Sequence, residues 1–222
     1  MARDAPDMFT GIIRETGRLA SLKTARGVTR LEVESPRSAG VIAPGDSVAV
    51  NGICLTVTGV TGVRLAFDAT AETRRATTIA RWRAGEVVHV EPALRMGDAV
   101  GGHFVLGHVD GIGRIVRLSR RGGAAAMTVA LAPSLAAQLV PKGSIALDGV
   151  SLTLDAGPFP GRFTVTLIPQ TLALTRFGAA RAGEDVNVEL DMLAKAAARH
   201  VPLASILDRA WSRPGESSGE RT

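Results

Sequence analysis

The sequence predicts an all-β protein made of two tandem six-stranded antiparallel Greek-key barrels, which arise by internal duplication and are followed by a C-terminal α-helix. Three observations support this fold class. The chain repeats itself over most of its length, apolar residues alternate with other residues in short runs, and an Asn-Gly or Asp-Gly pair stands in the middle of each repeat. With 222 residues, the chain is long enough for two domains of about 100 residues each.

The internal repeat consists of three blocks that occur in the same order in both copies. Residues 8–22 align with 104–118, residues 45–57 with 142–154, and residues 72–91 with 170–189. The offset between aligned residues grows from 96 to 97 and then to 98. Because order and spacing are both kept, the blocks indicate a duplicated domain of about 97 residues.

Each copy contains about six short runs in which apolar residues alternate, as at Val48 and Val50 in the first copy. A period of two is typical of strands with one buried face. A short helical segment is expected before the last strand of each copy, at residues 71–80 and 170–178.

A tight hairpin is expected at the centre of each copy, at Asn51-Gly52 and at Asp148-Gly149. These dipeptides tolerate the positive φ angles that a two-residue hairpin loop requires. Six antiparallel strands in so small a domain favour one closed Greek-key barrel over two wide sheets.

The part of the chain after the second copy is rich in alanine and leucine, with apolar residues at helical spacing, such as Leu193 and Val201. It predicts a helix that Pro202 bends or restarts. The helix is expected either to join subunits or to dock on its own barrel. The expected divisions are an N-terminal extension (1–7), a first barrel (8–103), a second barrel (104–191), the helix (192–212) and a disordered tail (213–222).

Composition excludes several functional classes. Apolar runs are too short to cross a membrane, and no signal peptide is recognisable, so a cytoplasmic protein without a membrane partner is expected. The net charge of +5 raises nucleic acid as a partner, but the arginines are scattered and no groove-reading motif is present. Cys54 is the single cysteine, which excludes an intrachain disulfide. His103 and His108 are five residues apart, which suits neither a strand face nor a helix face, so no metal site is expected.

Six blocks of sequence carry a family resemblance: MFTG at Met8, NGICLTV at Asn51, GGHFVLGHVDG at Gly101, KGSIALDGVSLT at Lys142, LIPQT at Leu167 and VNVELD at Val186. They resemble the riboflavin synthase family, whose members contain two lumazine-binding repeats. The resemblance implies a homotrimer that binds 6,7-dimethyl-8-ribityllumazine, with one reacting site from each of two neighbouring subunits. It also implies transfer of a four-carbon unit between two such molecules, which gives riboflavin and 5-amino-6-ribitylamino-2,4(1H,3H)-pyrimidinedione without a cofactor.

The resemblance implies five catalytic candidates: Ser47, Cys54 and His108 for the first site, and Ser151 and Asp191 for the second. An imidazole can move protons near neutral pH, and a thiol can donate a weak hydrogen bond or act as a nucleophile. Each candidate also has a purely structural interpretation. Cys54 could be a small core residue, His108 a loop histidine, and Asp191 the N-cap of the terminal helix.

The resemblance further implies a set of substrate-binding residues in the matching strands and loops, whose backbone groups and hydroxyls suit the polar edges of a pteridine and a ribityl chain. They are Phe9, Gly11, Ile12, Ile13, Cys54, Leu55, Thr56, Asp68, Ala69, Thr70, Ala71, Glu72, Thr73, Gly107, His108, Val109, Lys142, Ser151, Leu152, Thr153, Thr166, Leu167, Ile168, Pro169, Gln170 and Thr171.

Two other functional classes compete with this one. A non-catalytic lumazine- or flavin-binding protein of the same fold would have lost candidate residues in one copy, whereas both copies retain them here. A flavin-dependent reductase would need a nucleotide-binding domain with a glycine-rich turn between a strand and a helix, and Gly101-Gly102 lies between strand runs instead. The sequence therefore favours the enzyme.

Overall fold

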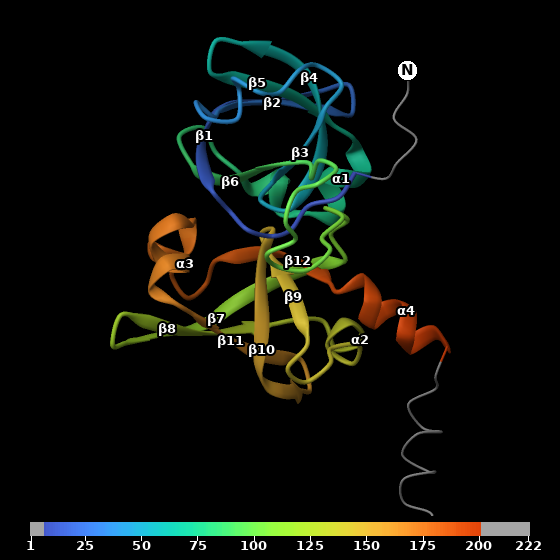
Figure 1. Ribbon diagram of the computed structural model, residues 1–222, viewed down its shortest axis with the longest axis vertical. Coiled ribbons are helices and arrows are strands. Elements are labelled where there is room, and N and C mark those ends of the chain that lie inside the picture. Colours follow the sequence, from blue (N-terminus) through green and yellow to red (C-terminus); the bar gives the residue numbers. More distant parts are fainter. Residues whose placement is uncertain (1–6, 201–222) are drawn as a thin grey trace, which may run out of the picture.

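The computed structural model describes residues 7–200, and it shows two closed antiparallel barrels of six strands each, one above the other in Figure 1. The first barrel contains β1 (Glu15–Ala25), β2 (Val28–Glu34), β3 (Ser47–Val50), β4 (Ile53–Thr61), β5 (Arg64–Ala69) and β6 (Val87–Pro92). The second contains β7 (Gly111–Arg121), β8 (Ala124–Ala130), β9 (Ser144–Leu147), β10 (Val150–Phe159), β11 (Arg162–Leu167) and β12 (Asp185–Leu190). The predicted fold class is confirmed.

The two barrels have the same Greek-key order. Neighbouring strands follow β1-β2-β5-β4-β3-β6 around the first barrel and β7-β8-β11-β10-β9-β12 around the second. The expected hairpins lie between β3 and β4 and between β9 and β10, where Asn51 and Asp148 both have φ of 44°. Each barrel has its own apolar core, with Phe67 in the first and Phe163 in the second.

Each expected helical segment is divided into two pieces. The first copy contains α1 (Ala71–Ala76) and a 3₁₀ turn, η1 (Thr78–Arg81). The second contains α3 (Pro169–Leu174) and η2 (Arg176–Gly178), and α2 (Pro133–Ala136) lies between β8 and β9. Extended residues, Thr77 and Thr175, interrupt each segment, and their hydroxyls accept a hydrogen bond from the first turn of the following 3₁₀ helix.

The two barrels pack through β3, β6, β9 and β12. β3 is buried at all four positions rather than alternately, because its outward face lies against the other barrel. There Ala49 and Ala146 join Phe9 and Val105 in a small apolar cluster.

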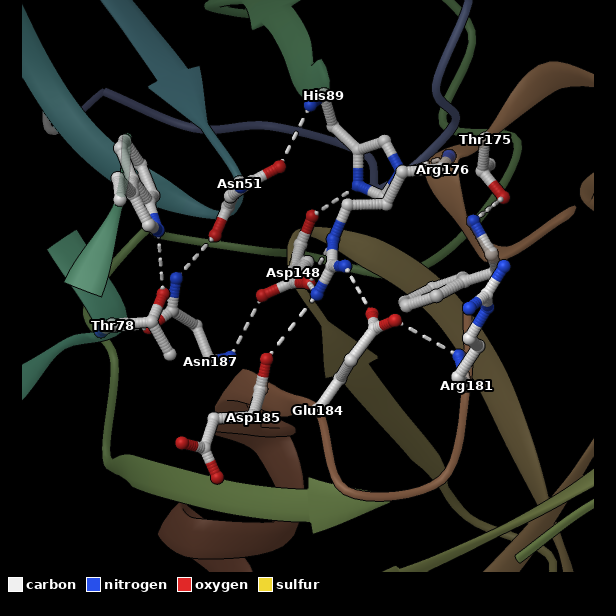
Figure 2. A network of polar contacts seen from close by, with 12 residues as sticks. Asn51, Thr78, His89, Asp148, Thr175, Arg176, Arg181, Glu184, Asp185 and Asn187 are labelled. Carbon is white, nitrogen blue, oxygen red and sulfur yellow. Dashed lines mark hydrogen bonds and ion pairs between the residues drawn. The ribbon is translucent and has the colours of Figure 1, made fainter. Parts of the chain in front are cut away.

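A buried polar network surrounds this contact (Figure 2). The backbone N–H of His89 donates to Asn51 Oδ1, and that of Asn187 donates to Asp148 Oδ1, both at 2.7 Å. His89 and Asn187 are separated by the repeat offset of 98 residues, and each reaches the hairpin of the other barrel: His89 Nδ1 donates to the carbonyl of Asp148, and Asn187 Nδ2 donates to that of Asn51. The network is therefore two-fold symmetric in its pattern.

The chain also exchanges two short segments between the barrels. We call residues 8–13 the first crossing segment and residues 104–110 the second. They pair with each other through the bridge between Phe9 and Val105. Ile13 of the first crossing segment enters the core of the second barrel, and Val109 of the second packs against the core of the first. The expected boundary between the first barrel (8–103) and the second (104–191) follows the sequence repeat and stays a prediction. In the structure, the first crossing segment contacts the second barrel, and the second crossing segment contacts the first.

The terminal helix begins as expected, and the structure describes α4 (Met192–His200). Asp191 caps it, since its Oδ1 accepts from the backbone N–H of Leu193 at 2.9 Å. Lys195 anchors it to the second barrel through both carboxylate oxygens of Asp110, at 3.0 Å each. Residues 1–6 of the expected extension, residues 201–212 of the expected helix and the expected tail lie outside the described residues. No described helix is long and apolar enough to span a membrane.

Candidate functional site

The clearest candidate site is a cavity of about 340 Å³ on the second barrel, which we call the second site. It lies where β10 meets the first crossing segment and the glycines that precede the second one. Its lining consists of Ile12, Gly101, Gly102, Ser144, Ser151, Leu152, Thr153, Asp155, Thr166, Ile168 and Thr171. Small-molecule sites are usually concave and combine apolar walls with a few fixed polar groups, and this cavity has both.

Ser151 of the second site is bonded to His103, although His103 and Asp191 do not themselves line the cavity. His103 Nδ1 lies 2.7 Å from Ser151 Oγ, and Asp191 lies close enough to favour the charged imidazole. Burial nevertheless lowers the pKa of His103 below its ordinary value, so the imidazole is a neutral base near pH 7. His103 Nε2 is buried and has no hydrogen-bond partner among the described residues. The arrangement can orient a serine hydroxyl and accept a proton.

The backbone of the first crossing segment touches the second site directly. The carbonyl oxygen of Gly11 accepts from the backbone N–H of Ser151 at 2.8 Å. Gly11 has φ of +73°, and a Cβ there would lie 2.6 Å from Ser151 Cβ. Only glycine therefore permits this approach.

The equivalent first site lies around Cys54 on the first barrel. The carbonyl of Gly107 accepts from the Cys54 N–H at 3.0 Å, as Gly11 does for Ser151. Ser47, on β3, donates its hydroxyl to Asp7 at 2.5 Å. Burial, together with the charge of Asp7, raises the pKa of the Cys54 thiol to about 11. At neutral pH the thiol is protonated, which favours a hydrogen-bonding role over a nucleophilic one.

Two buried glutamates hold the crossing segments in place. Glu91 accepts from the backbone N–H groups of Thr10 and Gly11, and Glu189 accepts from those of Leu106 and Gly107, at 2.7 and 2.9 Å. Burial raises the pKa of both carboxyls, that of Glu189 to about 7. The glutamates match across the repeat, so each crossing segment is held by the same arrangement, in which one carboxylate accepts from two consecutive backbone N–H groups.

Replacing Glu189 with glutamine is expected to weaken ligand binding at the first site. The side-chain amide can accept from one of the two N–H groups but places its own N–H groups against the other, which costs about 1–3 kcal/mol. Gly107 and His108 then lose their fixed position beside Cys54. Protection of the Cys54 thiol by ligand, followed by alkylation, measures the loss.

Glu91→Gln is the matched control for that prediction. It loosens the first crossing segment and should weaken the second site, leaving protection of Cys54 within about twofold of the original protein. Equal effects of both variants on Cys54 would contradict the assignment of one glutamate to each site.

The structure places the expected site residues in three groups. Ile12, Ser151, Leu152, Thr153, Thr166, Ile168 and Thr171 line the second site. Cys54, Gly107, His108 and Val109 gather at the first, with His108 exposed and Val109 packed on the first core. Phe9, Ile13, Leu55, Ala69 and Leu167 are buried.

Other expected residues form contacts within the protein or are exposed to solvent. Asp68 forms an ion pair with Arg30 at 2.9 Å, and Thr70 caps α1. Lys142 is exposed in a turn with φ of 61°, where the first copy has Gly45. Thr56, Ala71, Glu72, Pro169 and Gln170 are exposed, whereas Thr73 is half-buried.

A larger cavity of about 560 Å³ lies beside Arg81, Arg114 and Asp185. Asp185 forms ion pairs with both arginines, which leaves one net positive charge, and none of the expected site residues lines this cavity. Among residues 7–200, no group of three or more His, Cys, Asp or Glu side chains could hold a metal ion.

Sequence reasoning missed Asp7, His103, Glu91 and Glu189 as site residues. The spacing of His103 and His108 argues only against a metal site, although the offset of 96 aligns His103 with Asp7. Glu91 and Glu189 match across the repeat, but a conserved spacing between two copies does not show which backbone groups a side chain binds.

Comparison with known proteins agrees with the repeat and the fold. The lumazine binding domain model matches residues 10–93 and 106–191. Riboflavin synthase of Bacillus subtilis (strain 168) is 42% identical over 188 residues, which cover 85% of this chain and 87% of that protein. Riboflavin synthase of Brucella abortus (strain 2308) is 39% identical over 197 residues, or 86% of this chain and 97% of the relative.

Among solved structures, LumP complexed with 6,7-dimethyl-8-(1'-D-ribityl) lumazine superposes with a TM-score of 0.74 at 21% identity and covers 82% of this chain and 98% of LumP. LumP complexed with riboflavin gives 0.75 at 22% identity, with the same coverage. These likenesses support the fold, and the family follows from the closer relatives and the two matched repeats. The chain belongs to the riboflavin synthase family.

Proposed function

We propose that the chain is a transferase that converts two molecules of 6,7-dimethyl-8-ribityllumazine into riboflavin and 5-amino-6-ribitylamino-2,4(1H,3H)-pyrimidinedione. The observation that carries this proposal is the pair of equivalent sites, each made from one barrel's hairpin and a crossing segment. A reaction between two identical molecules requires two similar sites, and fixed sites replace a bimolecular encounter with a positioned one. The two substrates contain all the atoms of the two products, so no oxidant, reductant or cofactor is needed.

The second site supplies the clearest acid–base group. The reaction requires removal of a proton from a 7-methyl group and addition of a nucleophile to the ring. His103 is a neutral base within 2.7 Å of the Ser151 hydroxyl, and Asp191 stabilises the imidazolium that proton transfer would produce. Cys54 and Ser47 act at the first site as hydrogen-bonding groups, beside His108.

Removing either member of the His103–Ser151 pair is expected to slow turnover. His103→Gln and Ser151→Ala should each lower kcat by about 10²- to 10⁴-fold, the range for a lost acid–base group. His103→Gln should also remove one limb of the pH–rate profile. Ser134→Ala, on the exposed surface of α2, is the control. Full activity of both variants would exclude the pair from the reaction.

The direct test of the proposed function is incubation of the purified chain with the lumazine while riboflavin absorbance is recorded. Riboflavin should form, with or without EDTA, because the proposed chemistry uses only the protein's own residues. Saturable binding of lumazine without riboflavin formation would favour the alternative, a non-catalytic lumazine- or flavin-binding protein.

We also propose a cytoplasmic homotrimer, in which the first site of one subunit faces the second site of a neighbour. Two features of α4 support it as the joining element: Lys195 and Asp110 fix its start to the second barrel, and Leu193 is 58% exposed. Sedimentation equilibrium of the full chain tests the stoichiometry, and a monomer with full activity would refute the shared site.

A further inference from the structure

We propose that Asp7 determines which ligand charge the first site accepts: its carboxylate selects an uncharged ring and disfavours an anionic one. The proposal deepens the proposed function, on which it rests for the identity of the ligand. The chemical class it selects is a neutral pteridine that carries its ring N–H, as opposed to the same ring after loss of a proton.

Asp7 is exposed, and its carboxylate reaches the first site through Ser47. Its Oδ2 accepts the hydroxyl hydrogen of Ser47 at 2.5 Å, and Ser47 is only 7% exposed on β3. The charge of Asp7 also opposes ionisation of the Cys54 thiol. The negative charge of the carboxylate therefore acts on Cys54, the side chain that is expected to face the ligand.

The offset of the repeat, extended by one residue before Met8, places Asp7 opposite His103. Asp7 precedes the first crossing segment as His103 precedes the second, at the same offset of 96 residues. Asp7 bonds to Ser47 on β3, and His103 bonds to Ser151 on β10, where the first copy has Cys54. The first site thus has an acid where the second has an imidazole.

Asp7 also fixes the direction of the Ser47 hydroxyl. Because Ser47 donates its hydrogen to the carboxylate, its oxygen offers only lone pairs to a ligand. An acceptor beside a negative charge suits a ring N–H or a ribityl hydroxyl. Other charged or titratable groups near this site are Glu189, whose charge also acts on Cys54, Asp46 next to Ser47, and His108 on the second crossing segment.

Cys54 provides a local probe of this charge, because it is the only cysteine of the chain. Iodoacetamide and iodoacetate both react by attack of the thiolate sulfur on the methylene carbon, with loss of iodide. The first reagent is neutral and the second is an anion, and the fraction of thiolate cancels in the ratio of their rates. The ratio therefore reports the potential near Cys54.

Asp7→Asn is expected to raise the rate of iodoacetate relative to iodoacetamide by roughly tenfold, the effect of removing one nearby, partly screened charge. Asp7→Glu should keep the original ratio within about twofold. Glu86→Gln removes an exposed carboxylate elsewhere on the first barrel and should also leave it unchanged. An unchanged ratio in Asp7→Asn, or equal changes in Asp7→Asn and Glu86→Gln, would overturn the inference.

Protection of Cys54 by 6,7-dimethyl-8-ribityllumazine separates this inference from the proposed function. If the lumazine slows alkylation but Asp7→Asn leaves the ratio unchanged, the charge inference fails while lumazine binding at the first site stands. If the ratio rises but the lumazine gives no protection, Asp7 sets the charge preference of a site whose ligand is something else.

Discussion

Gly11→Ala is expected to remove the second ligand site and to reduce lumazine binding from two molecules per chain to one. The added Cβ would lie 2.6 Å from Ser151 Cβ and 2.7 Å from Ser151 N. The backbone cannot easily retreat, because the Gly11 carbonyl is bonded to that same N–H. The positive φ of 73° adds a cost of about 1–2 kcal/mol for any L-residue. Turnover should fall at least about 100-fold, because positioning errors near 1 Å have effects of that size.

Gly107→Ala is the matched variant for the first site. Its φ is +74°, and an added Cβ would lie 2.6 Å from Cys54 Cβ. Gly59→Ala is the control, since a Cβ there meets only Ala66 Cβ at 3.9 Å. Calorimetric titration with the lumazine distinguishes the sites, and alkylation of Cys54 shows which one remains. If Gly11→Ala emptied the first site instead, the exchange of segments between the barrels would be wrong.

The exchange itself shows how far the sequence could predict this structure. Alternating residues and the two hairpin dipeptides predicted six strands per copy, and the repeat predicted that both copies fold alike. The alignment of Gly11 with Gly107 could not say which barrel each glycine touches. Because the copies are nearly equivalent, swapped and unswapped segments bury the same kinds of residue.

The candidate site was predictable to a similar degree. The strands around Cys54 and Ser151 were expected as ligand-facing, and the structure brings both against a crossing segment. The sequence does not point to His103, because its hydrogen-bond partner, Ser151, is 48 residues away and the two side chains meet only in the folded chain. β3 departs from simple alternation for a related reason: contact with a second barrel buries the face that would otherwise meet water.

The last expected result concerns His89, the buried imidazole between the barrels (Figure 2). Its Nδ1 donates to the Asp148 carbonyl at 2.8 Å, and its Nε2 accepts from the Arg176 backbone N–H at 2.9 Å. Only the neutral ring with its proton on Nδ1 satisfies both bonds. Burial lowers the pKa of His89 to about 4, so protonation requires a large part of this contact to break.

The pH dependence follows from comparing the two states. Between pH 6.5 and about 4 the unfolded chain binds a proton at His89 and the folded chain does not. The free energy of unfolding therefore falls as the pH is lowered through this range, by about 1.4 kcal/mol per pH unit and about 3 kcal/mol in total from this group. Above pH 6.5 the full contribution is present.

His89→Asn should remove that slope while keeping the protein folded at pH 7. The equivalent position of the second copy already holds an asparagine, Asn187. Its Nδ2 donates to the Asn51 carbonyl and its Oδ1 accepts from the Thr78 N–H, both at 2.8 Å. An amide at position 89 can make the same two bonds to Asp148 and Arg176 without titrating. Urea unfolding between pH 4 and 7.5 should show the variant gaining stability relative to the original chain as the pH falls, whereas His108→Asn, which alters an exposed histidine, should not. If the free energies of unfolding of His89→Asn and the original protein change with pH in parallel, protonation of His89 does not weaken the contact between the barrels.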